Sequence, residues 1–143
     1  MDQRGTTLTG VVLDASVLGP LIIPDEAPNE HPSLIDILRS GVVIVPSHWH
    51  LEVANLGRSA IRRGRLDEST FAARLSDLGT FELETDAETP QRAWSEIASL
   101  ATRHGLTSYD AAYLELAVRR DALLLCGDAA LTKAALAQGV ELL

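Results

Sequence analysis

The stretch LTSYDAAYLELAVRRDALLLCGD, residues 106–128, decides the fold class of this chain. Thr107 or Ser108 can cap a helix that runs to about Arg120, because a side-chain oxygen at this position accepts a free backbone N–H of the first turn. Leu123–Cys126 then forms a short apolar run that ends just before an acid. Bounded apolar runs of this length predict buried strands of a parallel sheet.

The same alternation of strands and helices recurs outward from this stretch. Further strands are expected at Val11–Leu13, Val42–Val45, Phe81–Glu84 and Val140–Leu143. Longer helices are expected from Pro46 to about Ile61, from Glu68 to Leu78 between Asp67 and Gly79, from Pro90 to His104 before Gly105, and from Asp128 to Gly139. Gly19–Pro20 and Pro24 predict a short helix, a loop near Asp25–Pro32 and a helix near Ser33–Leu38. The pattern predicts an α/β fold, a parallel sheet flanked by helices on both faces.

The composition indicates a single domain with an aliphatic core. Of the 143 residues, 46% are hydrophobic and only 4% are aromatic. One domain is expected over residues 11–143, after a flexible lead-in at residues 1–10. No run approaches the roughly 20 apolar residues that span a membrane, and no secretory signal is expected. The single Cys126 excludes an internal disulfide, which fits a cytoplasmic protein.

Four acids are expected to converge at one edge of this sheet. Asp14 directly follows the first predicted strand, and Glu52 lies about two turns into the helix after the second. Asp110 lies in the first turn of the helix before Leu123–Cys126, and Asp128 follows that strand. In an open parallel sheet, ligands bind at the carboxyl ends of the strands, where such acids can meet.

Each acid also has an ordinary structural explanation. Asp14 or Asp128 alone can cap the next helix, and Asp110 fits a capping box that begins at Thr107. Glu52 can be a solvated helix position. These alternatives do not explain why Glu52 and Asp110 stand among apolar residues, because a carboxylate there is costly unless it is paired, protonated or bound to metal. The joint pattern favours a site.

The predicted site favours Mg²⁺ or Mn²⁺ over zinc, because it offers carboxylates without cysteine. His48 and His50 point to different faces of a helix, and His31 and His104 are isolated, so all four are interpreted as structural or surface residues. The chain has no Gly-rich phosphate loop and no Gly-x-Ser-x-Gly elbow. A phosphatase of haloacid-dehalogenase type is the nearest alternative, but its motif needs a second Asp where Ser16 stands.

The net charge of −8 argues at first sight against a nucleic-acid partner. Bound cations would restore much of the charge of a carboxylate site, however. Four arginines also fall within eight positions: Arg58, Arg62, Arg63 and Arg65. Arg63 would lie roughly 16 Å beyond Glu52 on the same helix face, which suits contact with a phosphate. The alternative is an ordinary solvated helix end.

Four stretches, in this order and spacing, resemble the PIN-domain ribonucleases, and within them the VapC-type toxins of bacterial toxin–antitoxin pairs. The stretches are Val12–Ser16, Val45–Asn55, Leu106–Ala117 and Leu124–Leu131, and the resemblance extends from Val11 to Leu143. It implies a Rossmann-like sheet and cleavage of RNA phosphodiester bonds with Mg²⁺ or Mn²⁺. It also implies three partners, namely RNA, a small antitoxin protein and a second copy of the chain in a homodimer.

The resemblance assigns roles to individual residues. The residues that match the family's four catalytic and metal-binding acids are Asp14, Glu52, Asp110 and Asp128. Ser16 matches the small hydroxyl that supports the first acid, and Ser108 and Asn55 are expected to support the site from the matching stretches. The arginines expected to bind the RNA are Arg58, Arg62, Arg63 and Arg65.

The chain departs from the family pattern at Cys126, where Thr or Ser is common, at Gly19–Pro20 and at Trp49–His50. These departures bear on the orientation of Asp128 and on the shape of the cleft. The remaining alternative is a PIN-like module that binds RNA or protein without catalysis, although all four acids are present. The sequence leaves open which RNA is cut and whether one or two ions act.

Overall fold

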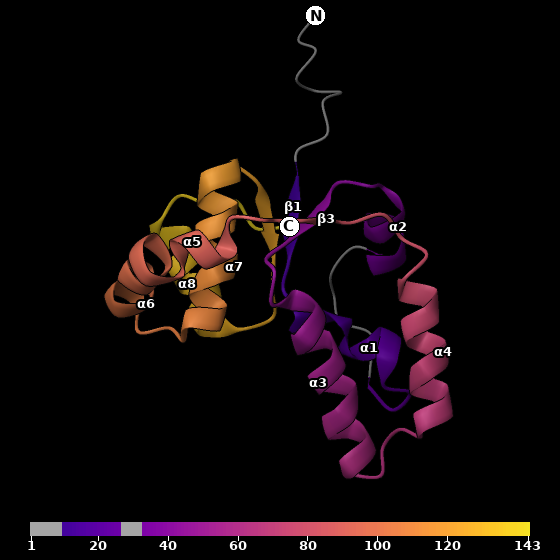
Figure 1. Cartoon of the computed structure of the whole chain (residues 1–143). Helices are drawn as coiled ribbons and strands as arrows, with labels where there is room; N and C mark the ends of the chain where they lie inside the picture. Colours follow the sequence, from indigo (N-terminus) through magenta and orange to yellow (C-terminus); the bar gives the residue numbers. More distant parts are fainter. Residues whose placement is uncertain (1–9, 27–32) are drawn as a thin grey trace, which may run out of the picture.

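The computed structural model describes residues 10–26 and 33–143, which form four parallel strands with helices on both sides (Figure 1). The strands are β1 (Val11–Leu13), β2 (Val43–Val45), β3 (Glu84–Thr85) and β4 (Leu123–Leu125). Their order is β3-β2-β1-β4, so β1 pairs with both β2 and β4. The lead-in predicted at residues 1–10 lies outside the described residues, apart from Gly10.

Helices α1–α4 lie on one side of the strands and α5–α8 on the other, as Figure 1 shows. The first group contains the 3-10 turn η2 (Ala15–Leu18), α1 (Gly19–Ile22), α2 (Leu34–Arg39), α3 (Trp49–Arg62) and α4 (Glu68–Leu78). The second contains α5 (Thr89–Arg92), the π-helical turn η3 (Ala93–Ile97), α6 (Ala98–His104), α7 (Ser108–Arg120) and α8 (Ala129–Ala137). This arrangement confirms the predicted α/β class. Within residues 10–26 and 33–143, no helix is long and apolar enough to cross a bilayer.

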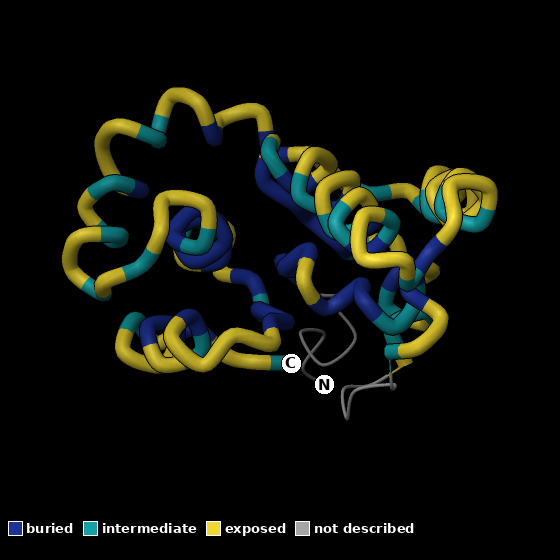
Figure 2. Tube along the Cα trace, turned by 90° about the horizontal axis from the view of Figure 1, so that it is seen from below, coloured by how far each residue is buried: buried dark blue, intermediate teal, exposed yellow. Residues whose placement is uncertain are grey.

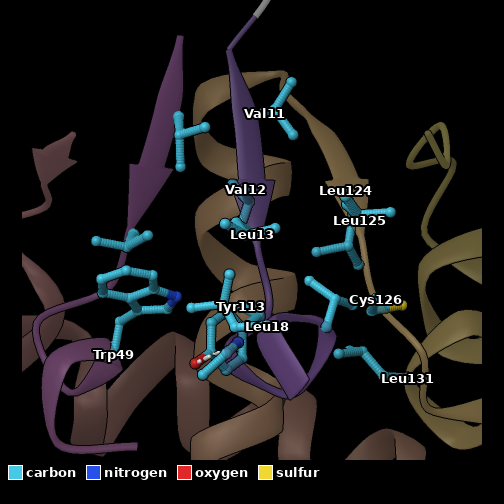
Figure 3. Packing of buried hydrophobic residues seen from close by; sticks show 14 of the residues in the cluster. Val11, Val12, Leu13, Leu18, Trp49, Tyr113, Leu124, Leu125, Cys126 and Leu131 are labelled. Atoms are coloured by element: carbon cyan, nitrogen blue, oxygen red, sulfur yellow. Dashed lines mark hydrogen bonds between the residues drawn. The ribbon is translucent and has the colours of Figure 1, made fainter. Parts of the chain in front are cut away.

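The core is centred on β1, the strand with a partner on each side. Val12 and Leu13 are fully buried, as are Leu124 and Leu125 in β4 and Tyr113 in α7. Figure 3 shows Tyr113 at the carboxyl end of β1, beyond Leu13. In Figure 2 the buried segments run through the middle of the molecule, while the outer turns of the helices are exposed. Burial on both faces explains why β1 and β4 read as unbroken apolar runs.

Several helix boundaries follow the predicted local signals. At the start of α4, Asp67 accepts the backbone N–H of Thr70 at 2.7 Å. At the start of α7, Thr107 accepts the backbone N–H of Asp110 at 3.1 Å. Gly105 ends α6 in the left-handed conformation, with a φ of 66°. These caps confirm the ends that the sequence predicts for the three helices.

Other predicted boundaries are wrong. The helix expected from Pro46 begins only at Trp49, because the N–H of Trp49 first closes a turn on the Pro46 carbonyl. The strand expected at Phe81–Glu84 is the shorter β3, since pairing with β2 begins only at its last residue. The strand expected at Val140–Leu143 is reduced to a single bridge with β4. The helix expected over Pro90–His104 is present but contains the π-helical turn η3.

A buried ion-pair network joins the loop after β3 to α7. Arg119 contacts Asp86 at 2.7 Å and Glu115 at 2.9 Å, and both carboxylates are buried. Asp86 also accepts the hydroxyl of Thr89 at 3.2 Å. Burial acts to raise the pKa of Asp86, but the guanidinium of Arg119 holds it below its ordinary value. Arg119 is therefore the cation shared by both buried carboxylates, and Glu115 also lies 3.7 Å from Arg92.

Replacing Arg119 with Met should cost about 3 kcal/mol of unfolding free energy, because it leaves the buried Asp86 without its cation and Glu115 with only the longer contact to Arg92. Urea unfolding at pH 7 measures this. Arg120→Met is the matched control on the next residue, since Arg120 pairs with the exposed Glu84 at 2.6 Å. An exposed pair of this kind contributes less than about 1 kcal/mol. Equal losses for the two variants would contradict a structural role specific to Arg119.

Candidate active site

All four predicted acids line one cavity of about 850 Å³ at the carboxyl ends of the strands. Asp14 follows β1, and Asp128 follows β4. Glu52 lies in the first turn of α3, one turn earlier than expected because the helix starts late, and Asp110 lies in the first turn of α7. The side chains thus reach one cavity from four separate elements.

Asp14 is held at the point where strand pairing ends. Its backbone N–H still pairs with the carbonyl of Leu125 at 3.0 Å, and its side chain is only 5% exposed. The carboxylate accepts the hydroxyl of Ser16 at 2.8 Å and the backbone N–H of Ser16 at 3.3 Å. Burial raises the pKa of Asp14 above its ordinary value despite these hydrogen bonds, and the charges of Asp110 and Glu52 add to the rise.

Asp110 and Asp128 each combine a position in the cavity with a helix start. Partial burial raises the pKa of Asp110, and repulsion from Asp128 and Glu52 raises it further. Asp128 caps α8, because its Oδ2 accepts the N–H of Leu131 at 2.8 Å. The capping explanation is therefore correct for Asp128, but it does not remove the side chain from the cavity lining.

The turn after β4 accommodates Cys126, one of the predicted departures, without distortion of the cap at Asp128. Cys126 Sγ lies 3.4 Å from the hydroxyl of Thr132, which donates to the backbone carbonyl of Asp128 at 2.8 Å. Cys126 is buried, and burial raises the pKa of its thiol. The cysteine therefore packs beneath this turn while the cap at Asp128 remains intact.

Glu52 is held by two aromatic residues. The buried Tyr113 donates its hydroxyl to Glu52 Oε1, and His48 Nε2 lies 3.3 Å from the same oxygen. The His48 contact is short but is not aligned as a hydrogen bond. Although burial acts to raise the pKa of Glu52, these two partners hold it below its ordinary value.

Sequence reasoning missed both partners of Glu52. The sequence predicts a structural or surface role for His48, yet this residue lines the cavity. Its signal is the spacing of four residues from Glu52, which places both side chains on one helix face. Tyr113 carries a comparable signal, since it follows Asp110 by three residues on α7. His31 lies outside the described residues.

The other predicted site residues divide into two groups. Ser16 and Asn55 line the cavity with Arg63 and Arg65. The predicted residues absent from its lining are Ser108, Arg58 and Arg62, and all three are exposed. Arg65 forms a bidentate pair with Asp25, at 2.6 and 3.1 Å, and lies 3.5 Å from Glu26. Its charge is therefore already matched within the protein.

The donor set suits a hard divalent cation in its chemistry, because it consists of carboxylates whose charges repel one another. In the described part of the chain, however, no three Asp, Glu, His or Cys side chains are grouped closely enough to hold an ion as they stand. Local partners account for the difference, since Asp14, Glu52 and Asp128 each bond to a neighbour.

Comparisons with known proteins agree with this fold. The family model described as PIN domain matches residues 11–136. The chain is 29% identical over 118 residues to the protein named Ribonuclease VapC3 from Pyrobaculum aerophilum, a match that covers 82% of this chain and 88% of that one. The crystal structure of PAE2754 from Pyrobaculum aerophilum superposes with a TM-score of 0.65 at 21% identity, covering 88% of this chain and 84% of that one. The latter likeness is one of fold.

Replacing Asp14 with Asn removes a buried charge but keeps an oxygen that can accept from Ser16. Because the pKa of Asp14 is raised in the folded chain, its ionised form opposes folding, and this penalty disappears as the pH falls through the raised pKa toward 3.8. Asp14→Asn should therefore be at least as stable as wild type in EDTA at pH 7. The difference should shrink on acidification, as measured by urea unfolding between pH 7 and pH 4.

Asp67→Asn is the matched control at the exposed cap of α4. Hydrogen bonds from Thr70 hold the pKa of Asp67 below its ordinary value, so its charge supports folding at neutral pH and this support is lost in acid. Asp67→Asn should accordingly be less stable than wild type at pH 7. A similar deficit in Asp14→Asn would identify Asp14 as an ordinary structural cap.

Proposed function

The chain belongs to the PIN-domain family, whose model matches residues 11–136, and we propose that it is a ribonuclease dependent on Mg²⁺ or Mn²⁺. The observation that carries the proposal is the meeting of four carboxylates from four elements in one cavity, with the pKa of Asp14 and of Asp110 raised. Raised carboxyl pKa values in a cleft are typical of functional sites. The similarity to a protein named Ribonuclease VapC3 supports RNA as the substrate.

In this proposal the cation would be held by Asp14, Glu52, Asp110 and Asp128. When bound, it would activate a water for in-line attack on phosphorus and stabilise the leaving oxygen. Ser16 orients the Asp14 carboxylate through two hydrogen bonds, and the N–H of Leu131 orients Asp128. Fixed orientation of this kind lets the carboxylates act without reorganising during the reaction.

We assign the RNA backbone contact to Arg63. It lines the cavity at the end of α3, about 16 Å along the helix axis from Glu52. That distance suits a phosphate a few nucleotides from the cleaved bond. Arg65 lines the same cavity, but its bidentate pair with Asp25 competes with RNA.

The partner proposed besides RNA is a small antitoxin protein, which binds a homodimer of this chain in the cytoplasm. A cavity lined by four acids is a natural acceptor for an Arg or Lys side chain of such a protein, since a charge-assisted pair can take the place of a cation. An open reading frame for a small DNA-binding protein directly upstream of the gene would support the pairing. The competing function is a module that binds RNA or protein without cutting.

Purified protein should cleave RNA in Mg²⁺ or Mn²⁺ and stop in excess EDTA. Asp14→Ala should lower the cleavage rate by more than about 100-fold, beyond the roughly 10–100-fold typical of residues that only orient metal ligands. Gel analysis of an end-labelled RNA measures both effects. Asp77→Ala, which removes an exposed acid of α4 outside the cavity lining, is the control and should cleave as wild type does.

Two results would contradict the nuclease proposal. Cleavage that persists in EDTA and in Asp14→Ala would show that the acid cavity is not its source. Tight RNA binding without any cleavage would instead favour the binding module.

Arg63→Ala should weaken RNA binding and lower the slope of log affinity against log salt by about 1, because one phosphate contact is lost. Fluorescence anisotropy with a labelled RNA at several salt concentrations, in EDTA, measures the slope without cleavage. Arg74→Ala on the exposed face of α4 is the control, since Arg74 lies outside the cavity lining. An unchanged slope in Arg63→Ala would show that Arg63 does not contact the RNA and is an ordinary solvated residue at the end of the helix.

A further inference from the structure

Tyr113 connects three elements of the acid cavity through one buried hydroxyl. The side chain is fully buried in α7, one turn after Asp110. Its oxygen accepts the backbone N–H of Ala15, the residue that follows Asp14, at 3.4 Å. The same hydroxyl donates to Glu52 Oε1 in α3. One side chain thus ties α7 to the end of β1 and to the start of α3.

Both contacts of Glu52 fall on the same oxygen. Tyr113 donates to Oε1, and His48 Nε2 lies 3.3 Å from Oε1. Among the hydrogen bonds of the described residues, none falls on Oε2. The carboxylate is therefore held by one oxygen, while the other remains available in a cavity that the residue lines.

Packing alone does not require this hydroxyl. Phe would fill the same space, whereas a buried hydroxyl is costly unless it is hydrogen-bonded. Burial raises the pKa of Tyr113, and the contact with Glu52 raises it further, so the hydroxyl keeps its proton at neutral pH. The His48 ring packs edge-on against Tyr113 at 5.2 Å, which limits movement of both rings.

We infer that Tyr113 is a positioning residue of the nuclease site, whose hydroxyl fixes Glu52 through Oε1 and leaves Oε2 to bind the divalent cation. This inference rests on the proposed function. Partners that orient a metal ligand in this way typically contribute 10–100-fold to metal affinity or activity. Tyr113 itself does not touch the cation or the RNA.

The test is Tyr113→Phe, which deletes the hydroxyl and keeps the ring. Mn²⁺ affinity, measured by calorimetry without RNA, should fall about 10–100-fold. The kcat for RNA cleavage should fall over a similar range, while KM for RNA stays within about twofold, because the phosphate contact at Arg63 is untouched. A merely structural hydroxyl would lower the melting temperature in EDTA and leave Mn²⁺ affinity unchanged.

Thr89→Val is the matched control, because Thr89 carries a buried hydroxyl with the same kinds of partner. It accepts the backbone N–H of Ser47 at 3.1 Å and donates to the carboxylate of Asp86 at 3.2 Å, outside the cavity lining. Thr89→Val should lower the melting temperature yet retain the Mn²⁺ affinity and kcat of wild type.

The outcomes separate this inference from the proposed function. If wild type neither binds Mn²⁺ nor cleaves RNA, the proposed function fails. If wild type does both and Tyr113→Phe matches it, the nuclease stands and the positioning role is overturned. Equal losses of Mn²⁺ affinity in Tyr113→Phe and Thr89→Val also overturn it, because they would reflect general destabilisation.

Discussion

The partial burial of carboxylates beside one another, at the carboxyl end of a small sheet, is the main physical constraint on this fold. Asp14 and Asp110 have raised pKa values because burial is combined with the charge of neighbouring acids. This repulsion is offset by the burial of β1 on both faces. It is also offset by the packing of the helices whose first turns carry the acids. The carboxylates thus lower the stability of the fold at one end of the sheet, and the burial of the apolar layer behind them offsets this loss.

The buried acids of the ion-pair network and the acids of the cavity have opposite kinds of partner. Asp86 and Glu115 share Arg119, which matches their charge and joins the loop after β3 to α7. The cavity acids receive mainly neutral donors, such as the hydroxyls of Ser16 and Tyr113. Neutral donors orient a carboxylate without cancelling its charge, so a cation can still gain from binding there. The contrast fits a structural network at Arg119 and the ligand site that we propose at the cavity.

The sequence predicts features set by local chemistry and misses those set by distant contacts. The caps at Asp67 and Thr107 were predictable, because each needs only the residues of one turn. The expectation that the four acids converge followed from the general rule that ligands bind at the carboxyl ends of parallel strands. By contrast, the pair between Arg65 and Asp25 spans 40 residues, and that between Tyr113 and Glu52 spans 61. No periodicity within one element encodes such pairs.

The cap that Asp128 provides to α8 gives the site an internal spectroscopic probe. The Leu131 amide donates to Oδ2 of a cavity acid, while the Leu131 side chain is fully buried in the core. Any ligand that binds this oxygen competes with the amide. Solvent exchange of the Leu131 N–H and its chemical shift should therefore change when a ligand occupies the cavity. The backbone amide of Leu131 therefore serves as a probe of the charge bound at the end of the sheet.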